Sequence, residues 1–230
     1  AMLDPGDEVL IPQPSYVSYV PCAVLAGGVP VIIELKAENE FRLTPEALEA
    51  AIRPKTKLLV MPFPNNPTGA IMEKNDLETI ADIVREHHLY VISDEIYSEL
   101  TYLERHVTIA SLQGMRDRTI VINGFSKSHA MTGWRLGYAC GPRIIIEQML
   151  KIHQFAIMCA PSTSQYAGVE ALRNGDEDVA AMRLVTSLTL VQAQLKSVFM
   201  VSLIVVAAIL GFTVASGLYF VRGIVVPLGQ

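Results

Sequence analysis

Three polar segments that could carry chemistry directly follow short apolar, strand-like runs of the chain. They are Asn65-Asn66-Pro67-Thr68-Gly69, Asp94-Glu95-Ile96-Tyr97 and Gly124-Phe125-Ser126-Lys127-Ser128. A buried strand that runs straight into a charged residue needs a reason, because an unpaired charge in such a place is costly. An amide, a carboxylate, a phenol and an amine that converge from neighbouring strands could line one pocket. The alternative is ordinary loop chemistry, in which Asn-Pro-Thr-Gly forms a turn and Asp94 caps a helix.

The apolar runs that precede these segments predict strands. Five such runs are Glu8–Ile11, Pro30–Ile33, Lys57–Met61, Tyr90–Ser93 and Thr119–Asn123. Each run is too short for a helix and too uniformly apolar for a half-exposed sheet. This pattern is typical of strands that are buried on both faces.

Helical patterns separate the runs. Residues 47–52 follow Thr44-Pro45-Glu46, which combines an N-cap, a proline at the first helical position and an early acid. Residues 73–87 place their apolar side chains on one stripe. Two further helices begin near Ile144 and Ser162. This alternation predicts an α/β domain with a mainly parallel sheet, in which ligands bind beyond the carboxyl ends of the strands.

Composition narrows the function classes. The formal net charge of −5 argues against a nucleic-acid-binding protein, which would need a basic face. The spacings of Cys22, Cys140 and Cys159 match no metal-ligand template, so we expect no metal site and three buried thiols in a reducing compartment. No basic segment followed by an apolar one opens the chain, so we expect no secretory signal and a natural start upstream of Ala1.

Taken together, the motifs resemble the class I/II aminotransferases, which are pyridoxal-phosphate enzymes of fold type I. The resemblance rests on Asn66–Gly69, Ser93–Tyr97 and Gly124–Tyr138, and in the third block Lys127 and Arg135 have the family's spacing of eight. It covers residues 1–183 and is strongest with the aspartate/aromatic and N-acetyl-diaminopimelate aminotransferases. The resemblance implies a three-layer, mainly parallel sheet, the large domain of that fold, truncated at both ends.

The resemblance also implies catalytic roles. Lys127 would form the Schiff base with pyridoxal 5′-phosphate and later move the proton from the substrate Cα. Asp94 would hold the pyridine nitrogen protonated, so that the ring accepts electrons. Tyr97 would donate a hydrogen bond to the phenolic oxygen of the cofactor.

Further residues would bind the cofactor without taking part in proton transfer. Asn66 would join Tyr97 at the phenolic oxygen, and Tyr16 would lie flat on the ring. Arg135 would bind the phosphate, with the hydroxyl of Ser126 beside it. The alternatives are a core aromatic at Tyr16, a turn hydroxyl at Ser126 and a surface ion pair at Arg135.

The activity implied is amino-group transfer between an amino acid and a 2-oxo acid, in a homodimer. Lyases and synthases of the same fold share most of these motifs and remain an alternative. An N-terminal arm, a Gly/Ser-rich phosphate-binding turn and a C-terminal small domain that grips the substrate carboxylate would lie outside residues 1–183. The resemblance therefore implies an incomplete substrate site.

The last 47 residues differ in composition from the rest, because Lys196 and Arg222 are their only charges. Residues 184–196 predict a connecting helix, and the uncharged stretch 197–221 is long enough to span a bilayer. Residues 222–230 resemble the start of a HAMP linker in chemoreceptors and sensor kinases. We therefore expect a single-pass membrane protein with a cytoplasmic aminotransferase part, or a cytoplasmic protein if the tail is an artefact. The alternatives are a buried core helix at 197–221 and a chimeric or vestigial membrane-anchored protein without catalysis.

Overall fold

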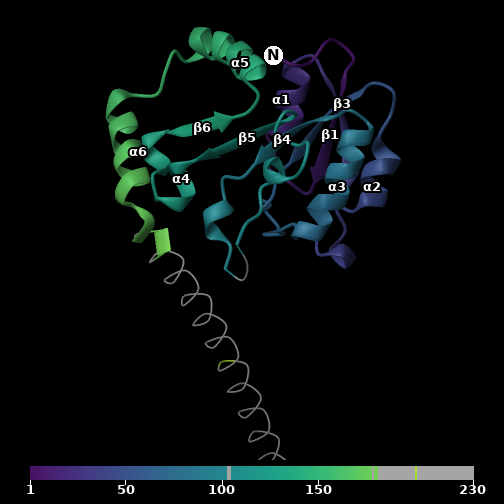
Figure 1. Ribbon diagram of the computed structural model, residues 1–230, viewed down its shortest axis with the longest axis horizontal. Coiled ribbons are helices and arrows are strands. Elements are labelled where there is room, and N and C mark those ends of the chain that lie inside the picture. Colours follow the sequence, from purple (N-terminus) through teal and green to yellow (C-terminus); the bar gives the residue numbers. More distant parts are fainter. Residues whose placement is uncertain (103–104, 178, 181–199, 201–230) are drawn as a thin grey trace, which may run out of the picture. The chain divides into compact units, whose positions relative to one another are not determined.

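One six-stranded sheet organises the protein (Figure 1). The computed structural model describes residues 1–102, 105–177, 179–180 and 200. The strands are β1 (Glu8–Gln13), β2 (Val29–Glu34), β3 (Thr56–Met61), β4 (Tyr90–Asp94), β5 (Thr119–Gly124) and β6 (Gly137–Cys140). Their order is β2-β1-β3-β4-β5-β6, and all pairings are parallel except that of β5 with β6. The five predicted strands are confirmed to within two residues, whereas the short antiparallel β6 was not predicted.

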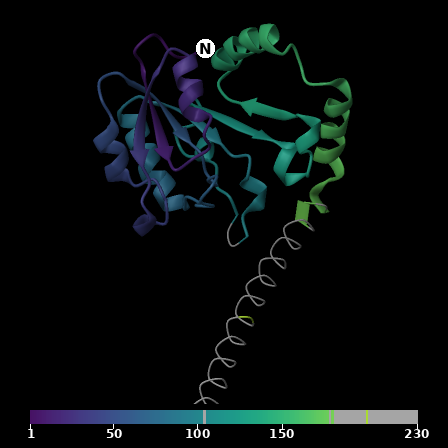
Figure 2. The same cartoon turned by 180° about the vertical axis from the view of Figure 1, so that it is seen from behind.

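The centres of β1, β3, β4 and β5 are apolar because both faces of the sheet are covered there. Leu10 and Leu59 belong to a core shared with α2 (Pro45–Ala51) and α3 (Lys74–Glu86). Their neighbours in the strands, Val9, Ile11, Leu58 and Val60, belong to a second core with α1 (Tyr19–Leu25). Successive side chains of a strand point to opposite faces, so α1 lies on the face opposite α2 and α3. Figures 1 and 2 show this arrangement from the two sides.

The helix-start signals act as the sequence predicts. The hydroxyl of Thr44 accepts a hydrogen bond from the backbone N–H of Ala47 at 3.3 Å, and Pro45 opens α2. The predicted helices correspond to α2, α3, α5 (Arg143–Ala156) and α6 (Ser162–Asn174). Two short helices, α1 and α4 (Phe125–Ser128), were not predicted.

The three cysteines are exposed, so the prediction of buried thiols is wrong. Cys22 lies on α1, Cys140 ends the edge strand β6 and Cys159 follows α5. Both of these helices have little cover within the chain, since Ala23 is the one buried residue of α1 and Ile145 that of α5. The error arose because composition alone does not reveal which helices pack on only one side.

Residues Ala1–Ala181 form one compact unit, which contains every side chain discussed below. The predicted segments 184–196, 197–221 and 222–230 lie outside the described residues, apart from Met200. None of the helices in the described part of the chain combines the length and the apolar character needed to cross a bilayer.

The junction of β5 and β6 requires glycine at position 124. A Cβ added to Gly124 would lie 2.9 Å from both the Cα of Gly137 and the carbonyl oxygen of Leu136. These are backbone atoms, so the two strands would have to separate. Gly124→Ala is therefore expected to lower the free energy of unfolding by about 1–3 kcal/mol in urea denaturation. Gly133→Ala is the matched control, because a Cβ there meets nothing within 4 Å, and an equal loss in both variants would contradict the close-approach argument.

Candidate active site

A cavity of about 320 Å³ lies beyond the carboxyl ends of β1, β3, β4 and β5. These four strands are consecutive in the sheet, so the loops that follow them meet at one edge. All seven residues singled out from the sequence line this cavity. They are Tyr16, Asn66, Asp94, Tyr97, Ser126, Lys127 and Arg135. Residues separated by more than a hundred positions are thus brought together by the parallel order of the strands.

Asp94 ends β4 and its carboxylate is held by two neutral donors. The hydroxyl of Tyr19 donates to Oδ2 at 2.7 Å, and the backbone N–H of Ile96 donates to Oδ1 at 3.2 Å. Burial, followed by the negative charge of Asp94, raises the pKa of Tyr19 far above its ordinary value, so this tyrosine stays a proton donor. Tyr19 also lines the cavity and was missed from the sequence. The available signal was its position one helical turn after Tyr16, but no helix had been predicted there.

Lys127 lies in α4, which begins where β5 ends. Its Nζ lies 5.6 Å from the centre of the Tyr97 ring, close enough for a cation–π contact. The nearby Thr132 hydroxyl donates to the carbonyl oxygen of Ser126 at 2.8 Å, and Nη1 of Arg135 donates to the carbonyl oxygen of Thr132 at 3.1 Å. These bonds tie the loop that carries Arg135 to the turn that carries Ser126.

A buried asparagine organises the loop after β3. Asn65 is 4% exposed, accepts hydrogen bonds from the N–H and the hydroxyl of Thr68, and donates to the carbonyl oxygen of Pro14 at 3.2 Å. It therefore joins the loops after β3 and β1, which carry Asn66 and Tyr16 respectively. Tyr16 is 49% exposed and packs edge-on against Tyr19, so it is not a core aromatic.

The charges around the cavity fit pyridoxal 5′-phosphate, the cofactor that the resemblance implies. In the described part of the chain, Asp94, Lys127 and Arg135 form no ion pair with another side chain. A partly buried carboxylate that faces only neutral donors suits a protonated ring nitrogen. An amine, a guanidinium and a hydroxyl suit an aldehyde and a phosphate. Arg135 is not engaged as a surface ion pair.

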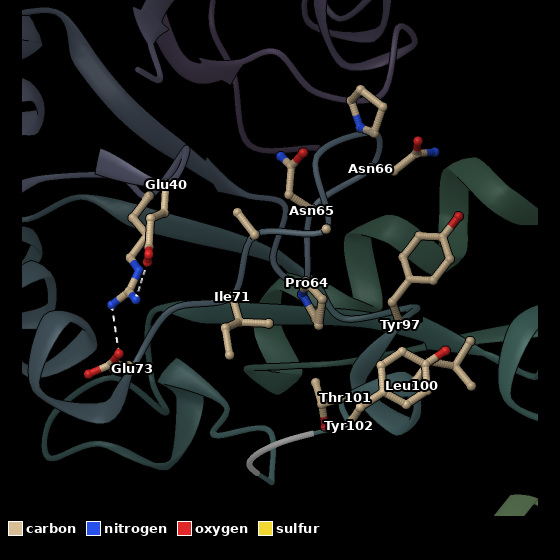
Figure 3. Close-up of a pocket in the computed structure, with 14 residues that line it drawn as sticks. Glu40, Pro64, Asn65, Asn66, Ile71, Glu73, Tyr97, Leu100, Thr101 and Tyr102 are labelled. Carbon is tan, nitrogen blue, oxygen red and sulfur yellow. Dashed lines mark hydrogen bonds and ion pairs between the residues drawn. The ribbon is translucent and has the colours of Figure 1, made fainter. Parts of the chain in front are cut away.

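A larger cavity of about 780 Å³ adjoins the first and shares Pro64, Asn66 and Tyr97 with it. Figure 3 shows Asn66 and Tyr97 on one side of this space and Glu40 and Glu73 on the other. The two glutamates are bound to the guanidinium of Arg42 at 2.6 and 2.8 Å. Arg42 is thereby neutralised by its own neighbours.

Comparison with known proteins agrees with this geometry. The family model for aminotransferase class I and II matches residues 1–208, which extends beyond the boundary at 183 expected from the sequence. The chain is 50% identical over 175 residues to an aspartate aminotransferase of Pyrococcus abyssi and 48% identical over 173 residues to aromatic-amino-acid aminotransferase 2 of Thermococcus litoralis. These matches cover 76% and 75% of this chain, but 45% and 44% of the relatives. The chain thus spans about half the length of the curated relatives it matches.

The fold agrees as well. The crystal structure of an aromatic aminotransferase from Pyrococcus horikoshii superposes with a TM-score of 0.77 at 49% sequence identity, covering 79% of this chain and 49% of that one. The fold, the motifs and the family match therefore all indicate an aminotransferase. The chain belongs to the class I and II aminotransferases, a family that depends on pyridoxal 5′-phosphate.

Proposed function

We propose that this chain provides the cofactor site of an aminotransferase that moves an amino group between an amino acid and a 2-oxo acid. The observation that carries the proposal is the convergence of Asp94, Lys127 and Arg135 on one cavity with no ion-pair partners among the described side chains. When bound, pyridoxal 5′-phosphate supplies an aldehyde that condenses with amines and a cationic ring that stabilises negative charge at the substrate Cα. The residues of the chain bind, orient and move protons around it.

In this proposal Lys127 supplies the amine that attaches the cofactor, and its Nζ then carries the proton at the substrate Cα. An amine can do both because it is nucleophilic when neutral and acidic when protonated. The ring of Tyr97 lies beside Nζ, which supports a role for its phenol in orienting that amine and in donating a hydrogen bond to the ring oxygen of the cofactor. Asn66 would add a second hydrogen bond to that oxygen.

Asp94 would hold the proton on the ring nitrogen through its negative charge. The hydrogen bonds from Tyr19 and Ile96 fix the carboxylate without neutralising it. Tyr16, at the mouth of the cavity, would cover the ring face.

Arg135 and Ser126 would bind the phosphate. A guanidinium offers paired N–H donors to two phosphate oxygens, and a hydroxyl adds a third donor. The Thr132 bridge between the two segments supports their joint action.

The proposal is tested by cofactor attachment. The full chain is incubated with pyridoxal 5′-phosphate, reduced with borohydride and analysed by peptide mass spectrometry. The expected result is one adduct, on Lys127. Labelling scattered over exposed lysines such as Lys151, or no labelling, would contradict the proposed site. Such a result would instead support a vestigial protein without catalysis.

Tyr19→Phe tests the support of Asp94 without needing the cofactor. The variant removes the 2.7 Å hydrogen bond to a partly buried carboxylate, and hydrogen bonds to charged groups are worth about 1.5–3 kcal/mol. We expect the free energy of unfolding in urea to fall by about that amount. Tyr166→Phe is the control, because Tyr166 is 79% exposed. Equal stability of the two variants would mean that the Tyr19–Asp94 bond does not hold in solution.

The substrates that we propose for this chain are those of its relatives. The relatives are aspartate, aromatic-amino-acid and N-succinyldiaminopimelate aminotransferases, so aspartate, aromatic amino acids and N-acylated diaminopimelate are the first substrates to test. Conversion of the bound cofactor to its amine form by one of them, with release of a 2-oxo acid, would support transamination. Elimination or ring-closure products would favour a lyase or synthase of the same fold.

We also propose that a second copy of the chain covers the exposed apolar side chains of α5. Phe155 is 92% exposed, and Leu150 and Ile152 are more than half exposed. Ile152 and Phe155 are three residues apart, so they lie on the same face of α5, and an apolar face of this kind is suited to contact with another protein surface. Light scattering is expected to give twice the chain mass, and Phe155→Asp is expected to give the monomer mass. A monomeric wild-type chain would exclude this interface.

A membrane anchor at 197–221 with a cytoplasmic aminotransferase part remains a proposal from the sequence. The absence of charge over this stretch supports it, although the family match extends to residue 208 and so overlaps it. Retention of the full chain in membranes after alkaline carbonate washing would support an anchor. Recovery in the supernatant without detergent would exclude one.

A further inference from the structure

The residue after Asp94, Glu95, carries a second carboxylate that the proposed chemistry does not use. The residue Glu95 is 4% exposed, and its Oε1 accepts hydrogen bonds from the hydroxyls of Ser93 at 2.9 Å and Thr108 at 2.5 Å. Its Oε2 lies 3.0 Å from Nε2 of His106, without the alignment of a hydrogen bond. Burying a carboxylate is unfavourable unless several such partners compensate, so its location requires an explanation.

Glu95 and Asp94 face opposite sides of the sheet. Asp94 contacts Tyr19 of α1, whereas Ser93 and His106 lie beside Leu77 in the core under α3. This is the alternation expected at the end of a strand. A change at Glu95 can therefore reach Asp94 and Tyr97 through the backbone of residues 93–98.

That backbone is fixed around Glu95. Its N–H donates to the carbonyl oxygen of Ile122 in β5 at 2.8 Å, and its carbonyl oxygen accepts from the N–H of Ser98 at 2.8 Å. The hydroxyl of Ser98 in turn accepts from Nδ2 of Asn123 at 3.1 Å. The turn that carries Asp94 and Tyr97 is thus joined to β5, the strand that leads into Lys127.

We infer that Glu95 is a positioning residue: its buried carboxylate, held by Ser93, Thr108 and His106, fixes the turn that directs Asp94 and Tyr97 into the cavity. This inference rests on the proposed function for its relevance to the cofactor. Glu95 does not line the cavity and acts only through its neighbours. A small displacement of this turn would matter, because catalytic groups need placement to within about 0.5 Å.

The first measurement is hydrogen exchange of the cofactor-free full chain. In Glu95→Gln the amides of residues 94–98 are expected to exchange roughly 10-fold faster, with the rest of the sheet unchanged. Thr108→Val, which removes one donor, is expected to act in the same direction, and Thr108→Ser, which keeps the hydroxyl, is expected to restore the wild-type rate. Unchanged exchange in both Glu95→Gln and Thr108→Val would overturn the inference.

The second measurement is a titration with pyridoxal 5′-phosphate followed by absorbance over a range of pH. Glu95→Gln is expected to raise the Kd roughly 10-fold and to move the pH midpoint of the absorbance change. Ile80→Val, a core change on α3, is expected to lower the melting temperature without moving either. If Glu95→Gln behaves like Ile80→Val, Glu95 only stabilises the core and the inference is wrong. A wild-type chain that binds no cofactor would overturn the proposed function, and the exchange rates would still decide whether Glu95 fixes the turn.

Discussion

Replacing Lys127 with alanine is expected to abolish covalent attachment of pyridoxal 5′-phosphate and to reduce amino-group transfer at least about 10⁴-fold. Among the described residues that line the cavity, Lys127 is the one lysine, so no other side chain there supplies an amine. Attachment is read from the intact mass after borohydride reduction, and transfer from single-turnover absorbance changes with excess amino acid.

The fold should survive this substitution. Nζ of Lys127 contacts the Tyr97 ring and takes part in no ion pair in the described part of the chain. The free energy of unfolding is therefore expected to change by less than about 0.5 kcal/mol. Lys127→Arg keeps the charge but cannot condense with an aldehyde, so it should fail in the same way. Lys151→Ala, on α5, should behave like the wild type. Persistence of a single specific adduct in Lys127→Ala would place the attachment point elsewhere.

The sheet could be predicted from the sequence because its strands are buried on both faces. Val9, Leu10 and Ile11 are all fully enclosed, and no alternation of polar residues obscures such a run. The helix α1 could not be predicted, since Ala23 is its only buried residue and no apolar stripe marks it. Strand β6 was not predicted for a similar reason. It has only four residues, begins at Gly137 and ends at the exposed Cys140, so it contains no buried apolar run.

The site residues near the predicted strands could be predicted, and those that depend on other elements could not. Asp94 ends β4, and Asn66 and Lys127 lie in the segments that follow β3 and β5, so the strand pattern alone places them at one edge of the sheet. Tyr19 lies on the unpredicted helix and therefore had no predicted place. The network around Glu95 depends on its contacts with His106 and Thr108, more than ten residues along the chain, which a local pattern does not reveal.

The second large effect is expected for Asp94→Asn, which removes a charge while keeping the shape of the side chain. If Asp94 faces a cationic ring, loss of this preorganised interaction should lower kcat roughly 10²–10³-fold. Single-turnover kinetics with saturating cofactor would measure the loss. Asp117→Asn is the matched control, because Asp117 is exposed and precedes β5, at the end of that strand opposite the cavity.

The stability of the same variant separates a functional charge from a structural one. In the cofactor-free chain one carboxylate oxygen of Asp94 accepts from the Tyr19 hydroxyl and the other from the backbone N–H of Ile96, and Asp94 has no ion-pair partner among the described side chains. An amide keeps one acceptor oxygen but turns an NH2 group toward the second donor, so one of the two hydrogen bonds is lost. Asp94→Asn is therefore expected to lower the free energy of unfolding by about 1–3 kcal/mol and also to lose activity in the folded chain. The pKa of Tyr19 should move back toward its ordinary value, since the nearby negative charge is gone. Lower stability together with unchanged activity would show that Asp94 supports the fold and not the cofactor.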